Sequence, residues 1–472
     1  MKKVVIALVA IVVILLALPL VTSMMTQSRL EQRVAQLNGN PVTVIEVASY
    51  DRGWLASTAR VELGISPSYL AQVTGGGVPP GAEFLEQRLP FVLDIKHGPV
   101  IFGDGVQLAL STVVATFDPE SPVSTMARDL LGMPYVFELR GRGNLFGGFE
   151  FTADIPPIDY GDGSNDLGFS GLHVDGNMRG EQVVVRGNID TFDYTGPTAR
   201  AVVEAVRFDM DMEYPEGGLG LGKGEFGIER IVVSSPFAGP DPLFTAQGLR
   251  AGGESAIDDN GRMRVSLNYG AASVAAGAGF SLADAELGIA LADLDAEAMN
   301  DYYETVRVVM GQQPAASPDE MLAAFMPVLE RVLDGGPSLA FDPIRFAMNG
   351  EPFTAKILVE VDPAALPPAA TRNYQDPSLW IAAATVTAEA QVSKVLAQDL
   401  ATQAMRMQLA GSGDPSLTEE DISAQAEAQA GFILVQLAGQ GMLQDAGNSY
   451  ATNARFASGT LTVNGTPIPL GL

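Results

Sequence analysis

Two histidines, His97 and His173, are the only imidazoles in the chain. Imidazole is a common general acid or base near neutral pH and a frequent zinc ligand. A zinc site built from both rings and a carboxylate has no support from an H-x-x-x-H spacing. Both residues lie in strand-like segments, so we interpret them as structural, and the sequence predicts no metal site.

Three segments resemble known ligand-binding loops, but each lacks an essential feature of the motif. Residues 217–224 nearly match a phosphate-binding loop, but Gly224 stands where Ser or Thr must bind magnesium. Residues 222–227 fit the dinucleotide glycine pattern, yet no strand-to-helix context accompanies them. Residues 159–166 have the oxygen density of a calcium loop, but Leu167 occupies the glycine position. With no G-x-S-x-G nucleophile elbow either, we predict no catalytic residue, no cofactor and no enzyme activity.

The most distinctive local segment is residues 50–58, which contain Arg52, Gly53 and Trp54. Glycine gives the backbone the freedom that a tight bend between two strands requires, and Trp54 would cover the joint. The alternative is a membrane-proximal role, with Arg52 meeting a lipid head group and Trp54 at the interface. We favour the structural bend and keep the membrane-proximal role open.

The composition excludes further classes of site. The chain has no cysteine, which excludes disulfides, thiolate zinc sites, iron–sulfur clusters and a catalytic thiol. It has 56 acidic and 28 basic residues, a formal net charge of −28. This field repels nucleic acid, so we expect no nucleic-acid partner. It suits a solubilising surface, and it also suits the recruitment of a cationic partner.

Residues 1–26 predict a membrane anchor. Lys2 and Lys3 precede an apolar run at residues 4–21, which is 18 residues long. Signal-peptide cores span ~7–15 residues, whereas ~20 residues cross a bilayer. The best cleavage position, after Ser23, places Val21 where a small residue is preferred. We therefore favour an uncleaved signal-anchor: a single pass through the bacterial inner membrane, with the lysines in the cytoplasm and the bulk of the chain in the periplasm.

Residues 27–293 predict a β-rich region. From residue 41 to about residue 269, segments rich in β-branched and aromatic residues alternate with Gly, Pro and Asp clusters, without a helical period between them. Asp259-Asn260-Gly261 suits a type I′ hairpin turn. This pattern is typical of long antiparallel sheets.

Residues 294–472 predict a mixed region of helix pairs and β-hairpins. We expect helices at residues 294–310, 317–334, 392–409 and 418–443, and hairpin turns at Asn349-Gly350 and Asn464-Gly465. The strands between the helices should extend the same sheet. The predicted fold class is therefore α+β, predominantly antiparallel β, with long curved sheets and helix pairs packed in the C-terminal half.

Three short motifs fall in order along the chain: residues 50–58 (YDRGWLAST), 96–100 (KHGPV) and 457–465 (ASGTLTVNG). Together with the export segment they resemble the YdgA-like family of bacterial envelope proteins, over nearly the whole chain. The resemblance implies an envelope location and a β-rich architecture, but no reaction and no catalytic residues. An anchored N-terminus before strand-rich segments is also similar, in architecture only, to AsmA-type proteins associated with lipid handling.

These observations favour a non-enzymatic, inner-membrane-anchored periplasmic protein whose curved sheet presents an apolar groove to a lipid or another hydrophobic envelope component. The alternative is an acidic scaffold that recruits another envelope protein. A hydrolase with an unrecognised carboxylate site is the third hypothesis, since scattered Asp and Glu residues could supply a pair.

Overall fold

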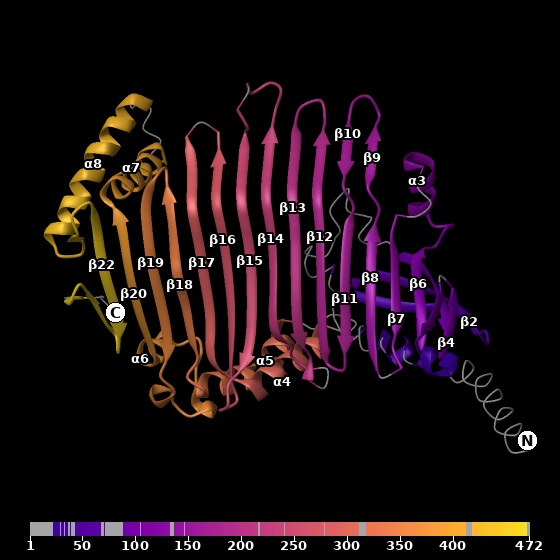
Figure 1. The fold of residues 1–472 in the computed structure, drawn as a ribbon. Coiled ribbons are helices and arrows are strands. Elements are labelled where there is room, and N and C mark those ends of the chain that lie inside the picture. The colour runs from indigo at the N-terminus through magenta and orange to yellow at the C-terminus, as the bar shows by residue number, and fades with distance from the viewer. Residues whose placement is uncertain are drawn as a thin grey trace, which may run out of the picture. The chain divides into compact units, whose positions relative to one another are not determined.

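The computed structural model describes most of the chain after residue 21 (Figure 1). The described residues are 22–28, 30–32, 34–35, 38, 43–67, 70, 88–103, 105–132, 136–145, 147–215, 218–239, 241–277, 279–310, 318–411 and 418–469. The apolar run at residues 4–21 lies outside them. Among the helices in these ranges, none is both long enough and apolar enough to cross a membrane.

The chain divides into two compact units. Unit 1 holds residues 1–197, 202–224 and 299–327, and unit 2 holds residues 198–201, 225–298 and 328–472. Each unit is built around antiparallel strands, and helices are few. The expected fold class, predominantly antiparallel β with some helices, is confirmed at this level.

Unit 1 contains one long antiparallel arrangement. Its elements are β1 (Thr43–Asp51), β2 (Ala56–Ile65), β3 (Leu89–His97), β4 (Val100–Gly103), β5 (Gly105–Leu108), β6 (Ser111–Phe117), α3 (Pro122–Leu131), β7 (Glu138–Gly143), β8 (Gly148–Ile155), β9 (Ile158–Gly161), β10 (Asp166–Phe169), β11 (Leu172–Arg179), β12 (Gln182–Thr195) and most of β13 (Arg200–Glu213). Pairing runs β1–β2–β3–β6–β7–β8–β11–β12, and β4 and β5 form a separate hairpin.

Two neighbouring strands of unit 1 break at the same level. Pro156 and Pro157 separate β8 from β9, and Ser170 and Gly171 separate β10 from β11. Gly171 has a φ of +99°, and a Cβ there would lie 2.7 Å from the carbonyl oxygen of Ile155. Glycine is therefore required where the two breaks face each other.

Helix α3 corrects the expectation of uninterrupted strands between residues 41 and 269. It begins after Ser121, whose Oγ accepts a hydrogen bond from the backbone N–H of Ser124 at 3.2 Å, and Pro122 is its first residue. A Ser cap followed by Pro is a helix-start signal. The helix has only 10 residues, but its apolar side chains recur with a clear helical period, so both its start signal and its period are present in the sequence.

Unit 2 is an antiparallel meander whose helices lie at the ends of its strands (Figure 1). It contains most of β14 (Leu221–Ser234), then β15 (Phe244–Ile257), β16 (Arg262–Ala276), β17 (Phe280–Asp295), β18 (Ser338–Met348), β19 (Glu351–Val361), α6 (Pro377–Ala383), β20 (Ala384–Ser393), α7 (Lys394–Gly411), α8 (Glu419–Gly439), β21 (Gln444–Asp445), β22 (Ser449–Ala457), β23 (Thr460–Val463) and β24 (Thr466–Ile468). Strands β15 to β20 pair in sequence order, followed by β22, β23 and β24.

The predicted helices are present with shifted ends. α4 (Ala296–Met310) and α5 (Pro318–Asp334) each contribute residues to both units, and Tyr302 packs on Phe325 at 5.4 Å between ring centroids within unit 1. In unit 2, α7 contacts β19, β20 and β22 and pairs with α8. Thr418 and Asp421 form a reciprocal capping box at the start of α8.

Turn chemistry explains which hairpin predictions were confirmed. Asn349 and Gly350 both have positive φ, as do Asn464 and Gly465, which is the type I′ geometry expected there. The prediction for Asp259-Asn260-Gly261 was wrong, because Gly261 alone has positive φ. The Asp258 carboxylate accepts hydrogen bonds from the backbone N–H groups of Asn260 and Arg262, which holds a wider loop.

Candidate functional site

The sheet of unit 2 has one face built almost entirely of apolar side chains. Successive residues of a strand point to opposite faces, so pairing register decides which residues share a row. We define the apolar face by three cross-strand rows: Val265, Leu291, Leu339, Val359 and Val386; Leu267, Ile289, Phe341, Ile357 and Ala388; and Tyr269, Leu287, Ile344, Ala355 and Ala390.

β-Bulges maintain the register of the three rows. Leu287 pairs with Ile344 and Ile289 pairs with Phe341, so β18 carries one extra residue, at Asp342-Pro343. Without it, Phe341 and Ile344 would point to opposite faces. A second irregularity in β17, beside Asp293 with a φ of +59°, aligns Leu291 with Val265. These bulges make the apolar face continuous across strands whose sequences alone do not align.

The side chains of the apolar face are incompletely covered. None of the residues in the three rows is fully buried, and Tyr269, Leu291 and Leu267 are 44%, 41% and 38% exposed. Large apolar side chains scattered singly over a surface are ordinary, but contiguous apolar patches are rare on monomeric soluble proteins. The rows are contiguous, which marks this face as a candidate binding surface.

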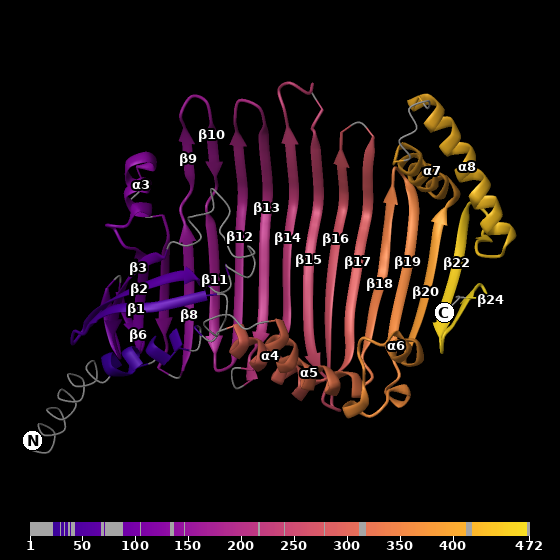
Figure 2. The ribbon, with the colours of Figure 1, turned by 180° about the vertical axis from the view of Figure 1, so that it is seen from behind.

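One end of the apolar face is closed. Met263 and Leu294, at one end of β16 and β17, are 2% and 4% exposed, and Leu333 near the end of α5 is 4% exposed. Figure 2 shows α5 lying over this end of the strands. Gly335, just after α5, sits so close to this end that a Cβ would lie 2.6 Å from Nη1 of Arg262. A hydrophobic core therefore exists at this end, and the three rows lie beyond it.

A hollow of about 490 Å³ lies at the β14 side of the apolar face. Its surface is almost wholly apolar, and its lining includes Phe226, Leu249, Tyr269, Leu287 and Phe346. Small-molecule sites have volumes of roughly 300–1,000 Å³ and normally add a few polar groups for orientation. Arg250, Glu286 and Arg345 also belong to the lining, but almost none of the exposed surface of the hollow is polar, so it offers mainly volume and apolar contact.

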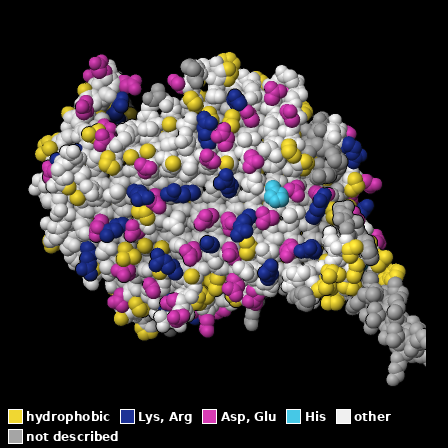
Figure 3. Space-filling view, viewed as in Figure 1, with side chains coloured by type: hydrophobic (Ala, Val, Ile, Leu, Met, Phe, Trp, Pro, Cys, Tyr) yellow, Lys and Arg dark blue, Asp and Glu magenta, His cyan; other side chains and the backbone are white. Residues whose placement is uncertain are grey.

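The opposite face of the unit 2 sheet is charged. Arg345 pairs with Glu286, and Nζ of Lys356 lies 3.0 Å from Oε2 of Glu389. Figure 3 shows basic and acidic side chains next to one another over these strands. The Lys356 and Glu389 side chains are each about half exposed, so this face is solvated. The two faces therefore differ sharply in what they can bind.

The residues singled out from the sequence, Arg52, Gly53 and Trp54, lie in unit 1 in the turn between β1 and β2. The Arg52 guanidinium donates to Oε1 of Gln27, with Nε at 3.0 Å. A Cβ on Gly53 would lie 2.0 Å from the carbonyl oxygen of Ala56, so only glycine fits. Trp54 is 47% exposed.

Two of the sequence motifs meet in a buried contact. Oγ of Ser57 lies 2.7 Å from Nε2 of His97, and these residues are 4% and 2% exposed. The Gly53 N–H donates to Ser57 Oγ at 3.2 Å, so the Ser57 hydroxyl proton is free to bond His97. Burial lowers the pKa of His97, which favours the neutral ring.

The described residues do not extend the Ser57–His97 pair into a catalytic triad. Nδ1 of His97 is buried without a hydrogen-bond partner among the described residues, so no carboxylate orients the ring. His173 is elsewhere on unit 1, on β11, with its Nδ1 2.6 Å from Oδ1 of Asp154. No cluster of three His, Asp or Glu side chains able to hold a metal occurs in the described ranges.

The near-matches to ligand loops are ordinary β structure where they are described. Gly222 and Gly224 lie within β14. Asp162 caps the turn between β9 and β10, where its Oδ1 accepts the N–H groups of Ser164 and Asn165 at 2.8 Å each. These bonds lower the pKa of Asp162 and occupy the carboxylate locally.

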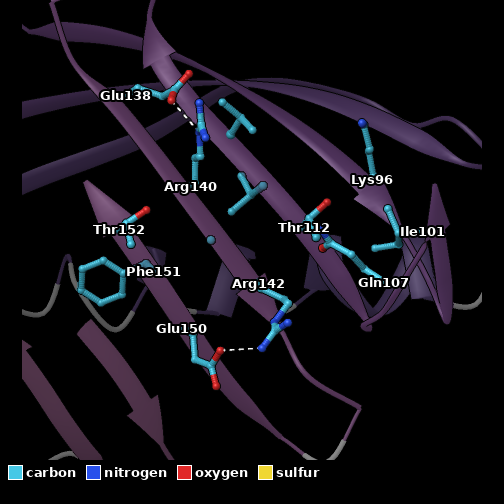
Figure 4. Close-up of a pocket in the computed structure, with 13 residues that line it drawn as sticks. Lys96, Ile101, Gln107, Thr112, Glu138, Arg140, Arg142, Glu150, Phe151 and Thr152 are labelled. Carbon is cyan, nitrogen blue, oxygen red and sulfur yellow. Dashed lines mark hydrogen bonds and ion pairs between the residues drawn. The ribbon is translucent and has the colours of Figure 1, made fainter. Parts of the chain in front are cut away.

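A hollow of about 470 Å³ in unit 1, with a mixed polar and apolar surface, is a second candidate (Figure 4). In it, Nε of Arg140 lies 2.6 Å from Oε1 of Glu138, and Nη2 of Arg142 lies 2.7 Å from Oε2 of Glu150. Each carboxylate is thus already bonded to an arginine. An anion entering this hollow must compete with internal ion pairs, so we rank it below the apolar face.

A protein-family model described as a bacterial protein of unknown function (DUF945) matches residues 1–471. The chain belongs to this family. The family description states no reaction and no ligand, so membership assigns neither to the chain. No curated protein and no solved structure matches the chain.

Proposed function

We propose that this member of the family is a non-enzymatic envelope protein that binds lipid acyl chains along the apolar face of unit 2. In the same proposal, residues 1–26 anchor it in the bacterial inner membrane and the bulk of the chain lies in the periplasm. The observation that carries the proposal is the set of three contiguous apolar rows in which no side chain is fully buried.

The chemistry of the apolar face favours an acyl chain over other occupants. A peptide or sugar brings polar groups that lose free energy when they are buried without hydrogen bonds. The hollow beside Tyr269 and Leu287 offers almost no polar surface to satisfy them. A hydrocarbon chain needs none, and each buried methylene contributes about 0.8 kcal/mol.

The proposal is tested by crosslinking in cells that express the full-length protein. Cells take up a fatty acid carrying a diazirine, and the crosslinked peptides are located by mass spectrometry. We expect crosslinks on β16 to β19 at residues of the three rows. Native lipid recovered with the purified protein gives an independent measurement.

A matched pair of variants separates the two faces of one strand. Leu267 lies on the apolar face, whereas Asn268 is its neighbour on β16 and points to the other face. Leu267→Glu places a charge against the acyl chain and should lower crosslinking by about tenfold or more. Asn268→Glu should leave it unchanged. Leu291→Glu provides a second apolar-face variant at a site that is 41% exposed.

Other results would reject lipid binding. Equal crosslinking in Leu267→Glu, Leu291→Glu and Asn268→Glu would show that the apolar face is not the site. If a general protein crosslinker instead captured one specific partner protein and the purified chain carried no lipid, the acidic scaffold would be favoured. The net charge of −28 supports that alternative.

A further inference from the structure

Exposed apolar side chains gather in the part of unit 1 that follows the apolar run at residues 4–21. Met24 and Met25 are 54% and 41% exposed, and Trp54 and Leu55 are 47% and 55% exposed. Val106 and Leu108 on β5 are both 69% exposed and, two residues apart, point to the same side of the hairpin. We call these six residues the terminal patch. Figure 3 shows hydrophobic side chains gathered at the lower right of the view.

Backbone hydrogen bonds join the parts of the terminal patch. The N–H of His97 donates to the carbonyl oxygen of Leu55 at 2.8 Å, and the N–H of Ala109 donates to that of Pro99 at 3.1 Å. Val100 pairs with Leu108 in the β4–β5 hairpin. The β1–β2 turn, the residues after β3 and the hairpin therefore form one connected surface.

The start of the described chain is attached to the same surface. Oγ1 of Thr22 donates to the carbonyl oxygen of Gly98 at 3.0 Å, and Oγ of Ser23 donates to that of Gly53 at 3.3 Å. Thr22 and Ser23 are 4% and 0% exposed, so these bonds are buried. The apolar run at residues 4–21 ends one residue before Thr22. Because a residue spans at most about 3.6 Å, the end of that run lies within about two residue lengths of Ser23.

We propose that the terminal patch of unit 1 rests on the bilayer surface and sets the position of unit 1 against the membrane. The inference uses the proposed anchor, but it is independent of lipid binding on unit 2. A span that ends next to Ser23 brings Gly53 and its neighbours to the polar layer of the bilayer, which is roughly 5–7 Å deep on each side. Trp is enriched at this depth because its ring is apolar and its N–H is polar.

Tryptophan fluorescence offers a direct test, because Trp54 and Trp380 are the only tryptophans in the chain. Trp380→Phe leaves Trp54 as the single reporter. Full-length protein is reconstituted in liposomes whose lipids carry bromine either near the glycerol end of the acyl chain or near its terminal methyl. We expect shallow bromines to reduce Trp54 emission about twofold, and deep bromines to have a smaller effect.

Patch variants supply the matched comparison. The double variant Val106→Ser and Leu108→Ser should weaken quenching of Trp54 by the shallow bromines. Tyr194→Ser, at a 36% exposed site near the opposite end of the strands of the same unit, should not change it. Lipid crosslinking on β16 to β19 should be the same in all three proteins, so the two proposals fail separately.

Two outcomes would overturn the inference. In the first, brominated lipids leave Trp54 emission unchanged while a water-soluble quencher reaches it as well in liposomes as in detergent. In the second, the patch double variant and Tyr194→Ser show the same quenching as the parent. Circular dichroism of each variant establishes that its β structure is retained.

Discussion

Acidification is expected to destabilise unit 1 through His97. The ring is 2% exposed, its Nε2 bonds Ser57, and its Nδ1 has no partner among the described residues. Protonation would place a charge in this buried site with no carboxylate bonded to it. Burial accordingly lowers the pKa of His97 from its ordinary value of about 6.5.

The sign of the pH dependence follows from this shift. Because the folded-state pKa is the lower one, the unfolded chain binds the proton more tightly than the folded chain. The contribution of His97 is therefore fully present above pH 6.5 and is lost as the pH falls below it. One proton gives a slope of up to ~1.4 kcal/mol per pH unit, so at most ~1.4 kcal/mol is lost by pH 5.5.

Urea unfolding of the Trp380→Phe protein measures this effect, since Trp54 then reports on unit 1. Free energies of unfolding at several pH values between 5 and 8 are compared with those of His97→Gln in the same background. Contributions from carboxylates common to both proteins cancel in the difference. A slope in His97→Gln equal to that of the parent would refute the argument.

Two backbone features give further predictions. Gly53→Ala should destabilise unit 1 by at least about 2 kcal/mol in the Trp54 assay, because its Cβ would meet a carbonyl oxygen at 2.0 Å. Gly180→Ala, at a φ of +59° with open space around it, should lower stability by only about 1 kcal/mol. Thr418→Ala removes the N-cap of α8 and should lower the stability of unit 2 by about 1 kcal/mol, measured with Trp380 in a Trp54→Phe protein.

The regular strands and the longer helices could be predicted because their periods are local properties of the sequence. Two of the three hairpin turns followed from Asn-Gly pairs, since both residues tolerate positive φ. At Asp259-Asn260-Gly261 the Asp258 carboxylate bonds the loop backbone and selects another turn. This side-chain competition is a feature that the dipeptide alone does not encode.

The candidate site could not be predicted from the sequence, for a different reason. Alternation shows which residues of β18 share a face only until Asp342-Pro343, where one extra residue reverses the order. Strict alternation would place Phe341 and Ile344 on opposite faces of the sheet, yet both lie in the apolar rows. The contact of Ser57 with His97 likewise joins segments 40 residues apart through β2–β3 pairing. Register, which is a non-local property, decides both sites.

The length of the strands explains why the apolar face stays open. β16 has 15 residues and β17 has 16, so each is about 50 Å long at ~3.3 Å per residue. A helix with its side chains is only ~10–12 Å wide, so α5 lying over one end covers about a quarter of that length. Within the uncovered length the three rows occupy residues 265 to 269 of β16, four residue steps or about 13 Å along the strand. Across the sheet they run over the five strands β16 to β20, about 19 Å at ~4.8 Å between neighbouring strands. Half the ~30 Å hydrocarbon thickness of a bilayer, the depth that one lipid's acyl chains span, is about 15 Å. An acyl chain laid across the strands therefore matches the apolar face, and crosslinks that follow one row from β16 to β20 would reveal that arrangement.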